Sequence, residues 1–392
     1  MSKALYLLIL LIINIRAWDL YFINISPNRW LVIQIVYLMV GFIYYGKFEV
    51  FSHCLPKLKY WMWWVIGVLI SMMCANYNYN QTLSQSIITY RNQLLLLQIP
   101  VLLKIAPTKE EITKATMWFV LFLWVIYFLQ LNNPYVIVHD EKLMERFLEK
   151  GEVLIVPGTV FAAIPIFYYL GIIKNNFDFK SLAIVLVCFL FLFFMQNRSM
   201  LFSVTVLIGW TTLTIKHKNK WLILLIMAVL VASVAYSTAD VWNALFEETA
   251  GQVDNEEYDR NKAYRYFIYE ASPNIWCYIF GNGLLSTHAT RHMINISAQG
   301  IFNSDVGFVG YWNYFGVFPI IVTMLMTVPV VLKKEHSHFL RCWAIQILIC
   351  GLTVWCWDGY KFLFWALFYY LYYYELEENE AETQQQIEES YG

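Results

Sequence analysis

Charged side chains are scarce in this 392-residue chain. Asp, Glu, Lys and Arg together make up 14% of it, whereas 59% is hydrophobic and 18% is aromatic. A soluble globular domain carries roughly 25% charged residues, so this composition excludes an ordinary water-soluble domain. The formal net charge is −1. Without a basic excess, the sequence offers no electrostatic basis for a nucleic-acid partner.

Motifs for metals, cofactors and nucleotides are also missing. The seven cysteines show no C-x-x-C spacing and nearly all fall within or beside apolar runs, which argues against a zinc site and a disulfide framework. His288 and His292 stand four residues apart, but no third ligand has a convincing spacing. The chain carries neither a nucleotide-binding glycine loop nor a paired-carboxylate glycosidase signature. We therefore expect no metal and no cofactor.

The chain consists instead of successive apolar runs of about 17–25 residues, separated by short polar stretches. This pattern predicts an all-α fold, a polytopic bundle of about twelve transmembrane helices. No small-residue cleavage site follows the first run, so we expect its helix to be retained. The predicted spans are 4–25, 30–46, 60–76, 83–103, 113–131, 153–173, 181–196, 199–215, 221–236, 304–332, 342–357 and 360–374.

The charges predict the topology. With the N-terminus inside, short inner loops hold 15 of the 27 basic residues, the bias expected for cytoplasmic loops. Both termini are then cytoplasmic, and residues 237–303 form one long extracytoplasmic loop that carries short helices. Residues 1–374 make up the transmembrane domain. Residues 375–392 form an acidic cytoplasmic tail, either a frayed helix or disordered.

Arginine is unevenly distributed across this topology. The 15 inner basic residues include one arginine, whereas the other 12 include eight: Arg16, Arg29, Arg91, Arg146, Arg198, Arg260, Arg265 and Arg291. Lysine suffices for topology, because membrane insertion responds to charge and not to geometry. Arginine offers planar, forked donors that suit phosphate or carboxylate. The distribution favours an anionic ligand on the outer side. The alternative is that these arginines pair with carboxylates of the outer loops.

Two of these arginines lie within or between apolar runs. Arg91 stands about 20 Å from the inner end of its predicted span at helical rise, well inside a hydrocarbon core of roughly 30 Å. Arg198 belongs to the short junction of two short spans. Intramembrane charges usually face a partner or a wet cavity. The alternative is that both side chains extend to the outer interface.

The segment at residues 140–150 fits one short amphipathic helix that contains Arg146. Such a helix can lie in the plane of the membrane interface. It could equally cover a site as a lid, which is the reading we favour.

Residues 239–270 predict a polar helix within the outer loop. Arg260 and Tyr264 share one face of it at i, i+4, and Arg265 follows directly. Pro273 marks the end of this helix, and the following Gly281-Asn-Gly283 allows a tight reversal of the chain.

The predicted span 304–332 has a carboxylate in its first turn, Asp305, which acts either as a helix cap or as a general base. Three glycines behind it indicate close helix packing: Gly307, Gly310 and Gly316. Four aromatic residues either stack on sugar rings or form an interfacial belt. They are Tyr311, Trp312, Tyr314 and Phe315.

Taken in order, several of these features look familiar: Arg198-Ser199, Arg260, Tyr264-Arg265, Pro273, Gly281-Asn-Gly283 and Asp305 with its glycines. This succession resembles the O-antigen polymerase and O-antigen ligase superfamily, mainly over residues 190–320. The resemblance implies a GT-C type glycosyltransferase of the bacterial inner membrane, with its active site facing outward. It implies undecaprenyl-pyrophosphate-linked oligosaccharide as donor and acceptor, no nucleotide sugar, and a chain-length regulator as a further partner to consider.

Ligases of this group carry a histidine where this chain has Asp305. The aspartate therefore favours a polymerase of repeat units for O-antigen, capsule or exopolysaccharide. This hypothesis assigns catalytic roles to Asp305, Arg260 and Arg198, and substrate binding to Arg265, Arg91, Arg146, Tyr264 and Arg291. A ligase and a lipid-linked oligosaccharide flippase remain alternatives. Transporters often contain two-fold internal repeats, and none is visible here.

Overall fold

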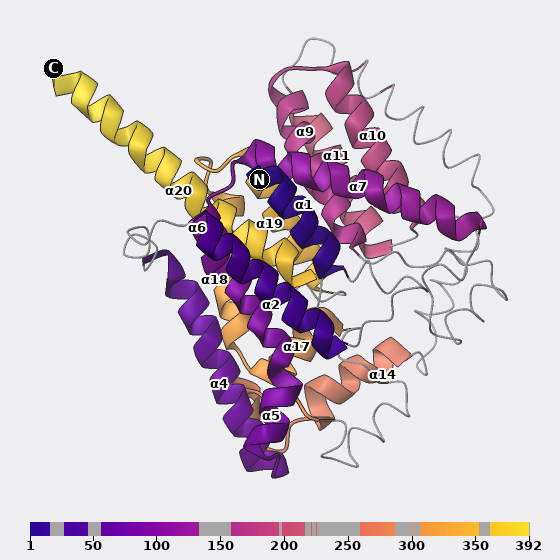
Figure 1. Cartoon of the computed structure of the whole chain (residues 1–392), viewed down its shortest axis with the longest axis vertical. Helices are drawn as coiled ribbons and strands as arrows, with labels where there is room; N and C mark the ends of the chain where they lie inside the picture. Colours follow the sequence, from indigo (N-terminus) through magenta and orange to yellow (C-terminus); the bar gives the residue numbers. More distant parts are fainter. Residues whose placement is uncertain are drawn as a thin grey trace.

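The computed structural model describes residues 1–15, 27–45, 56–132, 158–195, 198–215, 221, 225, 259–286, 301, 306–352 and 361–391. Throughout these ranges the regular structure is helical, and no strand occurs in them (Figure 1). The all-α class predicted from the sequence is therefore confirmed for the described part of the chain.

The long helices follow most of the predicted spans. In chain order the elements are α1 (Lys3–Asn14), α2 (Pro27–Tyr44), η1 (Pro56–Leu58), α4 (Lys59–Tyr79), α5 (Leu83–Thr89), η2 (Tyr90–Leu97), α6 (Gln98–Ile105), α7 (Lys109–Asn132), η4 (Thr159–Ala162), α9 (Ala163–Asn175), α10 (Phe179–Phe194), α11 (Arg198–Thr214), α14 (Asp259–Arg265), η5 (Tyr266–Glu270), α15 (Ile275–Phe280), α17 (Gly307–Phe315), α18 (Phe318–Leu332), α19 (His338–Gly351) and α20 (Lys361–Tyr391). The predicted span 221–236 lies almost entirely outside the described residues.

Two described helices are long and apolar enough to cross a membrane. They are Pro56–Tyr79, with a mean hydropathy of 1.4, and Lys109–Gln130, with a mean hydropathy of 1.8. Seven further apolar helices have 10–17 residues each, whereas a span at helical rise needs about 20. The twelve-span bundle consequently stays a prediction.

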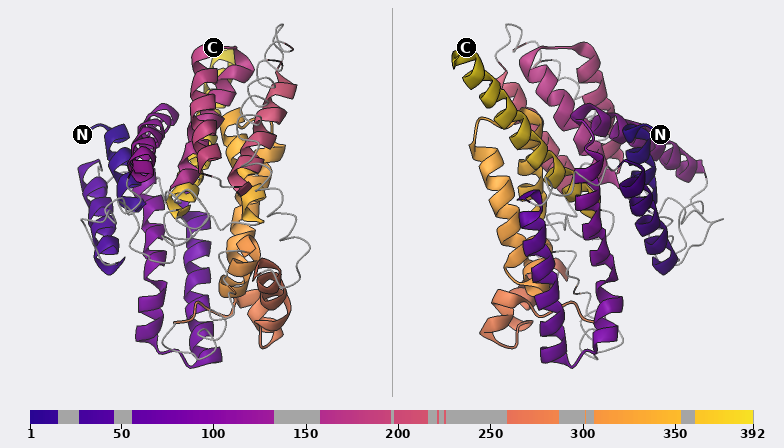
Figure 2. Two further views of the ribbon diagram at one scale, coloured as in Figure 1. Left: turned by 90° about the vertical axis from the view of Figure 1, so that its right-hand side faces the viewer. Right: turned by 60° about the vertical axis from the view of Figure 1, so that its left-hand side comes forward.

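The first half of α20 occupies the centre of the molecule. Every residue from Phe362 to Leu371 is at most 3% exposed. A helix that is hydrophobic all round has no polar face to turn to solvent, so it is stable only when other helices surround it. The indole of Trp365 packs against Trp64 of α4 at 6.1 Å between ring centroids, and Phe364 packs against Trp343 of α19 at 4.9 Å. Figure 2 shows this helix inside the bundle.

Where α20 leaves the bundle, ion pairs gather at one end. Glu375 is 3% exposed and accepts hydrogen bonds from the backbone and hydroxyl of Ser337. Lys109 lies 3.3 Å from Glu375 and 2.8 Å from Glu378. Beyond this point α20 continues as one helix to Tyr391. The tail is thus helical, as one of the two predicted alternatives has it.

The predicted span 304–332 is broken. α17 ends at Phe315, Gly316 adopts a φ of +67°, and α18 begins at Phe318. The break frees backbone groups that an unbroken helix would pair, and the reversal at Gly281–Gly283 takes them up. Asn282 and Gly283 donate their N–H groups to the carbonyls of Asn313 and Tyr314 at 2.7 and 3.0 Å. This pairing fixes the reversal to the bundle.

The predicted span 83–103 is also not one regular helix. It comprises α5, the 3₁₀ helix η2 and α6. Pro100 supplies no N–H to the carbonyl of Leu96 four residues earlier. The indole N–H of Trp61 donates to that carbonyl instead, at 2.9 Å. A 3₁₀ stretch of eight residues is long for its kind and marks strain or a functional irregularity.

Gly316→Ala should strongly destabilise the protein. A Cβ at Gly316 would lie 2.1 Å from the carbonyl oxygen of Ile279, and φ is positive there. The backbone strain alone costs about 1–3 kcal/mol, and the clash adds to it. Thermal unfolding of the purified protein in detergent measures the effect.

Gly209→Ala is the matched control, because nothing lies within 4 Å of its added Cβ in α11. Helix propensity there favours alanine by about 1 kcal/mol. Equal melting temperatures for the Gly316 variant and the wild type would refute the proposed packing of the break.

Candidate functional site

The candidate site is built around α14, the reversal at residues 281–283 and the broken span. In both views of Figure 2 the segment at 259–286 lies at the end of the bundle opposite the two termini. Ring contacts join it to the bundle, because Phe267 of η5 packs against Tyr314 of α17 at 6.2 Å between centroids. The side-chain amide of Asn313 also donates to the carbonyl of Phe267 at 3.4 Å.

Arg260 and Tyr264 lie on one face of α14, as their spacing predicts. The hydroxyl of Tyr264 donates to the carbonyl of Leu352, just beyond the end of α19. Burial raises the pKa of Tyr264, against a lowering by the nearby guanidinium of Arg260. Tyr264 therefore keeps its proton and serves as a hydrogen-bond donor at neutral pH.

Arg260 is half-buried and forms no ion pair with the described residues. Its Nε is buried and has no hydrogen-bond partner, and no carboxylate of the described residues forms an ion pair with it. An unsatisfied buried polar group costs about 1–3 kcal/mol, and more where it is charged. Within the described part of the chain, the Nε of Arg260 is thus left without an acceptor.

Arg265 behaves differently. Its side chain is 80% exposed and its Nε lies 3.6 Å from Glu270. For this arginine the alternative drawn from the sequence, pairing with an outer-loop carboxylate, describes the geometry. The residues after it, Tyr266–Glu270, form a single π-helical turn, an irregularity that is frequent at functional sites.

A chain of hydrogen bonds joins the outer loop to the interior. Leu284 donates its N–H to the hydroxyl of Tyr90 at 2.6 Å, and Ser71 donates to the carbonyl of Tyr314 at 2.7 Å. Since Ser71 has a single proton, the 2.6 Å contact between Ser71 and Tyr90 is donated by Tyr90. Tyr90, at the start of η2, is 4% exposed. The chain of bonds holds α4, η2, α17 and the loop together.

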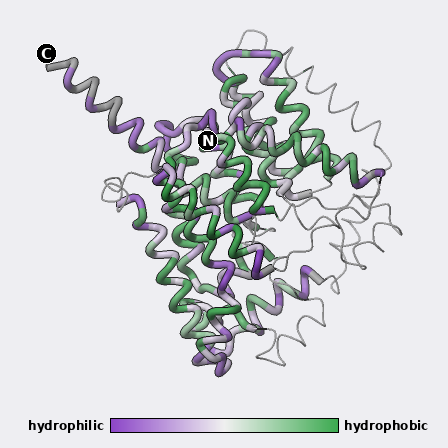
Figure 3. The backbone as a smooth tube through the Cα atoms, in the orientation of Figure 1, coloured by the Kyte–Doolittle hydropathy of each residue, from purple (hydrophilic) through white to green (hydrophobic). Residues whose placement is uncertain are grey.

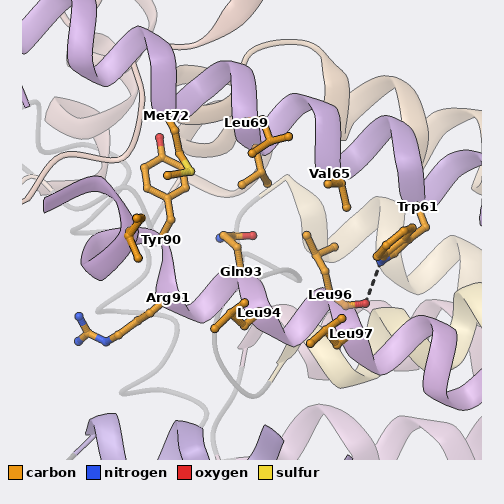
Figure 4. A pocket seen from close by; sticks show the side chains of 12 residues that line it. Trp61, Val65, Leu69, Met72, Tyr90, Arg91, Gln93, Leu94, Leu96 and Leu97 are labelled. Carbon is orange, nitrogen blue, oxygen red and sulfur yellow. Dashed lines mark hydrogen bonds between the residues drawn. The ribbon is translucent and has the colours of Figure 1, made fainter. Parts of the chain in front are cut away.

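Arg91 follows Tyr90 at the mouth of an apolar groove between α4 and η2 (Figure 4). The groove has a volume of about 400 Å³, and its walls include Val65, Leu69 and Leu94. One guanidinium nitrogen of Arg91 donates to the carbonyl of Ile88 at 2.8 Å. Among the described residues, no carboxylate forms an ion pair with it.

Other predicted site residues lie beyond what the structure describes. Asp305, Arg146, Arg291, His288 and His292 fall outside the described residues. Arg198 is the first residue of α11, and its side chain is outside them as well. Within the described ranges no group of three His, Cys, Asp or Glu side chains is arranged to hold a metal ion.

Three of the four aromatic residues at 311–315 form neither a sugar platform nor an interfacial belt. Tyr311, Tyr314 and Phe315 are at most 5% exposed and belong to the core. The indole N–H of Trp312 donates to the carbonyl of Tyr278. Both alternatives offered by the sequence are wrong for the three buried rings, because α17 is enclosed on several sides. Gly307 confirms close packing, since a Cβ there would lie 2.1 Å from the carbonyl oxygen of Gly351.

Several residues of this region carry no signal that sequence reasoning recognised. The side-chain amide of Gln81 donates to the carbonyl of Leu284 at 3.2 Å and accepts from the N–H of Ser286 at 2.8 Å. One side chain thus pairs with the loop backbone at two residues. Asn282 is 2% exposed and its Oδ1 has no donor. A polar residue between two glycines was the available clue to Asn282. Ser71 and Tyr90 stand in apolar sequence and offer none.

Comparison with known proteins gives no family assignment. No family model matches the chain, and no curated protein matches its sequence at a significant level.

Tyr90→Phe should lower the free energy of unfolding by about 1–3 kcal/mol, because the buried N–H of Leu284 and hydroxyl of Ser71 lose their partner. Unfolding in detergent, followed by circular dichroism, measures it. Tyr77→Phe on α4 is the control, since Tyr77 is 85% exposed and such changes stay within about 0.5 kcal/mol. If both variants melt together, the hydrogen-bond chain does not contribute to stability.

Proposed function

We propose that the protein is a membrane-embedded polymerase that joins oligosaccharide repeat units carried on undecaprenyl pyrophosphate. The resemblance described above supplies the reaction class. The half-buried Arg260, which has a buried Nε without an acceptor and a tyrosine on the same helix face, is the observation that carries the proposal. An anionic substrate group would complete its coordination.

The outward faces of the helices support a membrane setting. Along α4, the side chains of Ile66, Leu69, Met73 and Tyr77 are between 46% and 85% exposed and recur every three or four residues. Leaving each large apolar side chain in water forfeits about 1.5–3 kcal/mol, whereas lipid removes that penalty. In Figure 3 the hydrophobic residues follow the lengths of the helices of the bundle.

Arg91 and Arg260, which form no ion pair with a carboxylate of the described residues, flank one assembly. Tyr90, the neighbour of Arg91, contacts Phe315 of α17 at 5.9 Å between centroids. Arg260 belongs to the segment whose Phe267 packs on the same helix. Guanidinium groups bind pyrophosphate oxygens in forked geometry, so this arrangement suits a pyrophosphate donor.

The groove between α4 and η2 suits the lipid part of that donor. It extends alongside α4 from Trp61 to Met72, about 16 Å at helical rise. Its walls are almost wholly apolar, and Arg91 lies at one end. A polyprenyl chain in the groove would place its pyrophosphate beside this guanidinium.

In the proposed reaction, a hydroxyl oxygen of the acceptor sugar attacks the anomeric carbon of the donor. The new C–O bond forms as the bond to pyrophosphate breaks, and polyprenyl pyrophosphate leaves with the electron pair. Arg260 and Arg198, with Arg265 and Arg91, would stabilise the charge on the leaving group. Asp305 would accept the proton of the hydroxyl and pass it to water.

Deleting the gene tests the class of reaction. Loss of a polymerase should leave single repeat units on the lipid carrier or on its final acceptor. Loss of a ligase should leave long chains on undecaprenyl pyrophosphate. Mass spectrometry of the lipid-linked pool distinguishes the two outcomes. Long lipid-linked chains would refute the polymerase proposal and favour a ligase.

Arg260→Gln should abolish the polymer ladder on gels, and Arg260→Lys should lose most of it, because the ammonium lacks the planar fork. Lys262→Gln is the control, since it removes one positive charge from an exposed position of the same helix. Protein levels are checked by immunoblot. Wild-type ladders from both Arg260 variants at normal levels would reject this site.

A further inference from the structure

A second cationic cluster lies at the opposite end of the bundle, away from the proposed active site. It is formed by the ends of three helices: Lys174 near the end of α9, Trp210 in α11, and His338 with Arg341 in the first turns of α19. The Nζ of Lys174 lies 5.6 Å from the centre of the Trp210 ring and the guanidinium carbon of Arg341 lies 5.4 Å from it. Two positively charged groups thus lie within about 6 Å of the centre of one indole ring.

His338 fixes the cluster in place and supplies no negative charge. Its Nδ1 lies 3.1 Å from the ammonium of Lys174 and accepts a hydrogen bond from it. Its Nε2 lies 2.8 Å from the hydroxyl of Thr211, and its ring packs against Trp210 at 4.9 Å between centroids. The imidazole therefore orients the lysine beside the tryptophan.

Arg341 lacks an anionic partner among the described residues. One terminal nitrogen donates to the carbonyl of Val331 at 3.2 Å, and its Nε is buried without an acceptor. Nearby carboxylates are engaged elsewhere: Glu335 pairs with Lys333 at 3.1 Å, and Glu375 with Lys109 and Ser337. An anionic oxygen beside the guanidinium would supply the acceptor that Arg341 Nε lacks among the described residues.

The presence of arginine, and not lysine, at position 341 is informative. Among the 15 basic residues of the predicted inner loops, Arg341 is the one arginine. A lysine would serve topology equally well, whereas a forked guanidinium suits a phosphate. Lys174, Trp210, His338 and Arg341 are all partly exposed, so a ligand can reach them from outside the bundle.

We propose that Lys174, Trp210 and Arg341 bind the phosphate of an anionic phospholipid headgroup where these helix ends meet the membrane surface. Tryptophan and basic residues at helix ends are the usual partners of that surface. The proposal concerns the end of the bundle remote from Arg260 and does not depend on the proposed polymerase activity. A soluble phosphate offers the same chemistry, so the test includes it.

The test is a titration of the purified, detergent-solubilised full-length protein, followed through its melting temperature. Three probes are added separately: phosphatidylglycerol, phosphatidylcholine and inorganic phosphate. We expect phosphatidylglycerol to raise the melting temperature with saturation, and the other two to have little effect. An equal response to inorganic phosphate would overturn the lipid assignment in favour of a soluble ligand. An equal response to phosphatidylcholine would overturn the phosphate recognition.

Variants locate the site. Arg341→Gln should raise the half-saturating concentration of phosphatidylglycerol at least ten-fold, and Arg341→Lys several-fold, because it keeps charge and loses the fork. Lys334→Gln is the control, since it removes one charge from an exposed position at the same end and should leave the midpoint unchanged. Each protein is compared with its own lipid-free melting temperature. If Arg341→Gln folds poorly, Arg341→Lys, which retains the charge, still tests the site. Wild-type midpoints for both Arg341 variants would overturn the proposal.

Discussion

The arrangement depends on one constraint: backbone groups released inside an apolar bundle must find partners. At Gly316 the helix direction changes, and the carbonyls of Asn313 and Tyr314 would be unpaired without the N–H groups of Asn282 and Gly283. In the other direction, Val317 donates its N–H to the carbonyl of Ile279 at 3.0 Å. The reversal at residues 281–283 therefore completes the hydrogen bonding of the bundle. This explains how a polar segment acquires a fixed position next to an apolar core, and with it the position of Arg260.

Ion pairing is uneven among the basic residues of the bundle. Where α20 emerges, Lys57 pairs with Glu377 and Lys109 with Glu375 and Glu378. Near the opposite end Arg265 pairs with Glu270, whereas Arg91 and Arg260 form no ion pair with a carboxylate of the described residues. Since ion pairing offsets the cost of bringing charges close to an apolar interior, Arg91 and Arg260 carry a cost that the paired lysines avoid. A functional site commonly tolerates such a cost, because the ligand supplies the missing charge.

The sequence predicts the helical class, the shared face of Arg260 and Tyr264, and close packing at Gly307 and Gly316, because periodicity and glycine position have direct geometric meaning. It misses the 3₁₀ helix Tyr90–Leu97 within the predicted span 83–103, since hydropathy does not distinguish an α-helix from a 3₁₀ helix. It also misplaces the rings of Tyr311, Tyr314 and Phe315, because a run of aromatic residues has the same sequence pattern in a core and at a membrane interface. Ser71 and Tyr90 gain their role from residues more than 190 positions away, which no local pattern encodes.

Arginine usage links both ends to one chemistry. The structure gives Arg260 and Arg341 a buried Nε with no acceptor among the described residues. The guanidinium of Arg341 lies over the ring of Trp210, which excludes water from one side and leaves the forked edge open. Arg260 acts electrostatically on the hydroxyl of Tyr264. A lysine in either place would keep the charge but could reorient its proton donors at little cost. The choice of arginine at both positions agrees with the two proposals, in which Arg260 and Arg341 each bind the oxygens of a phosphate group.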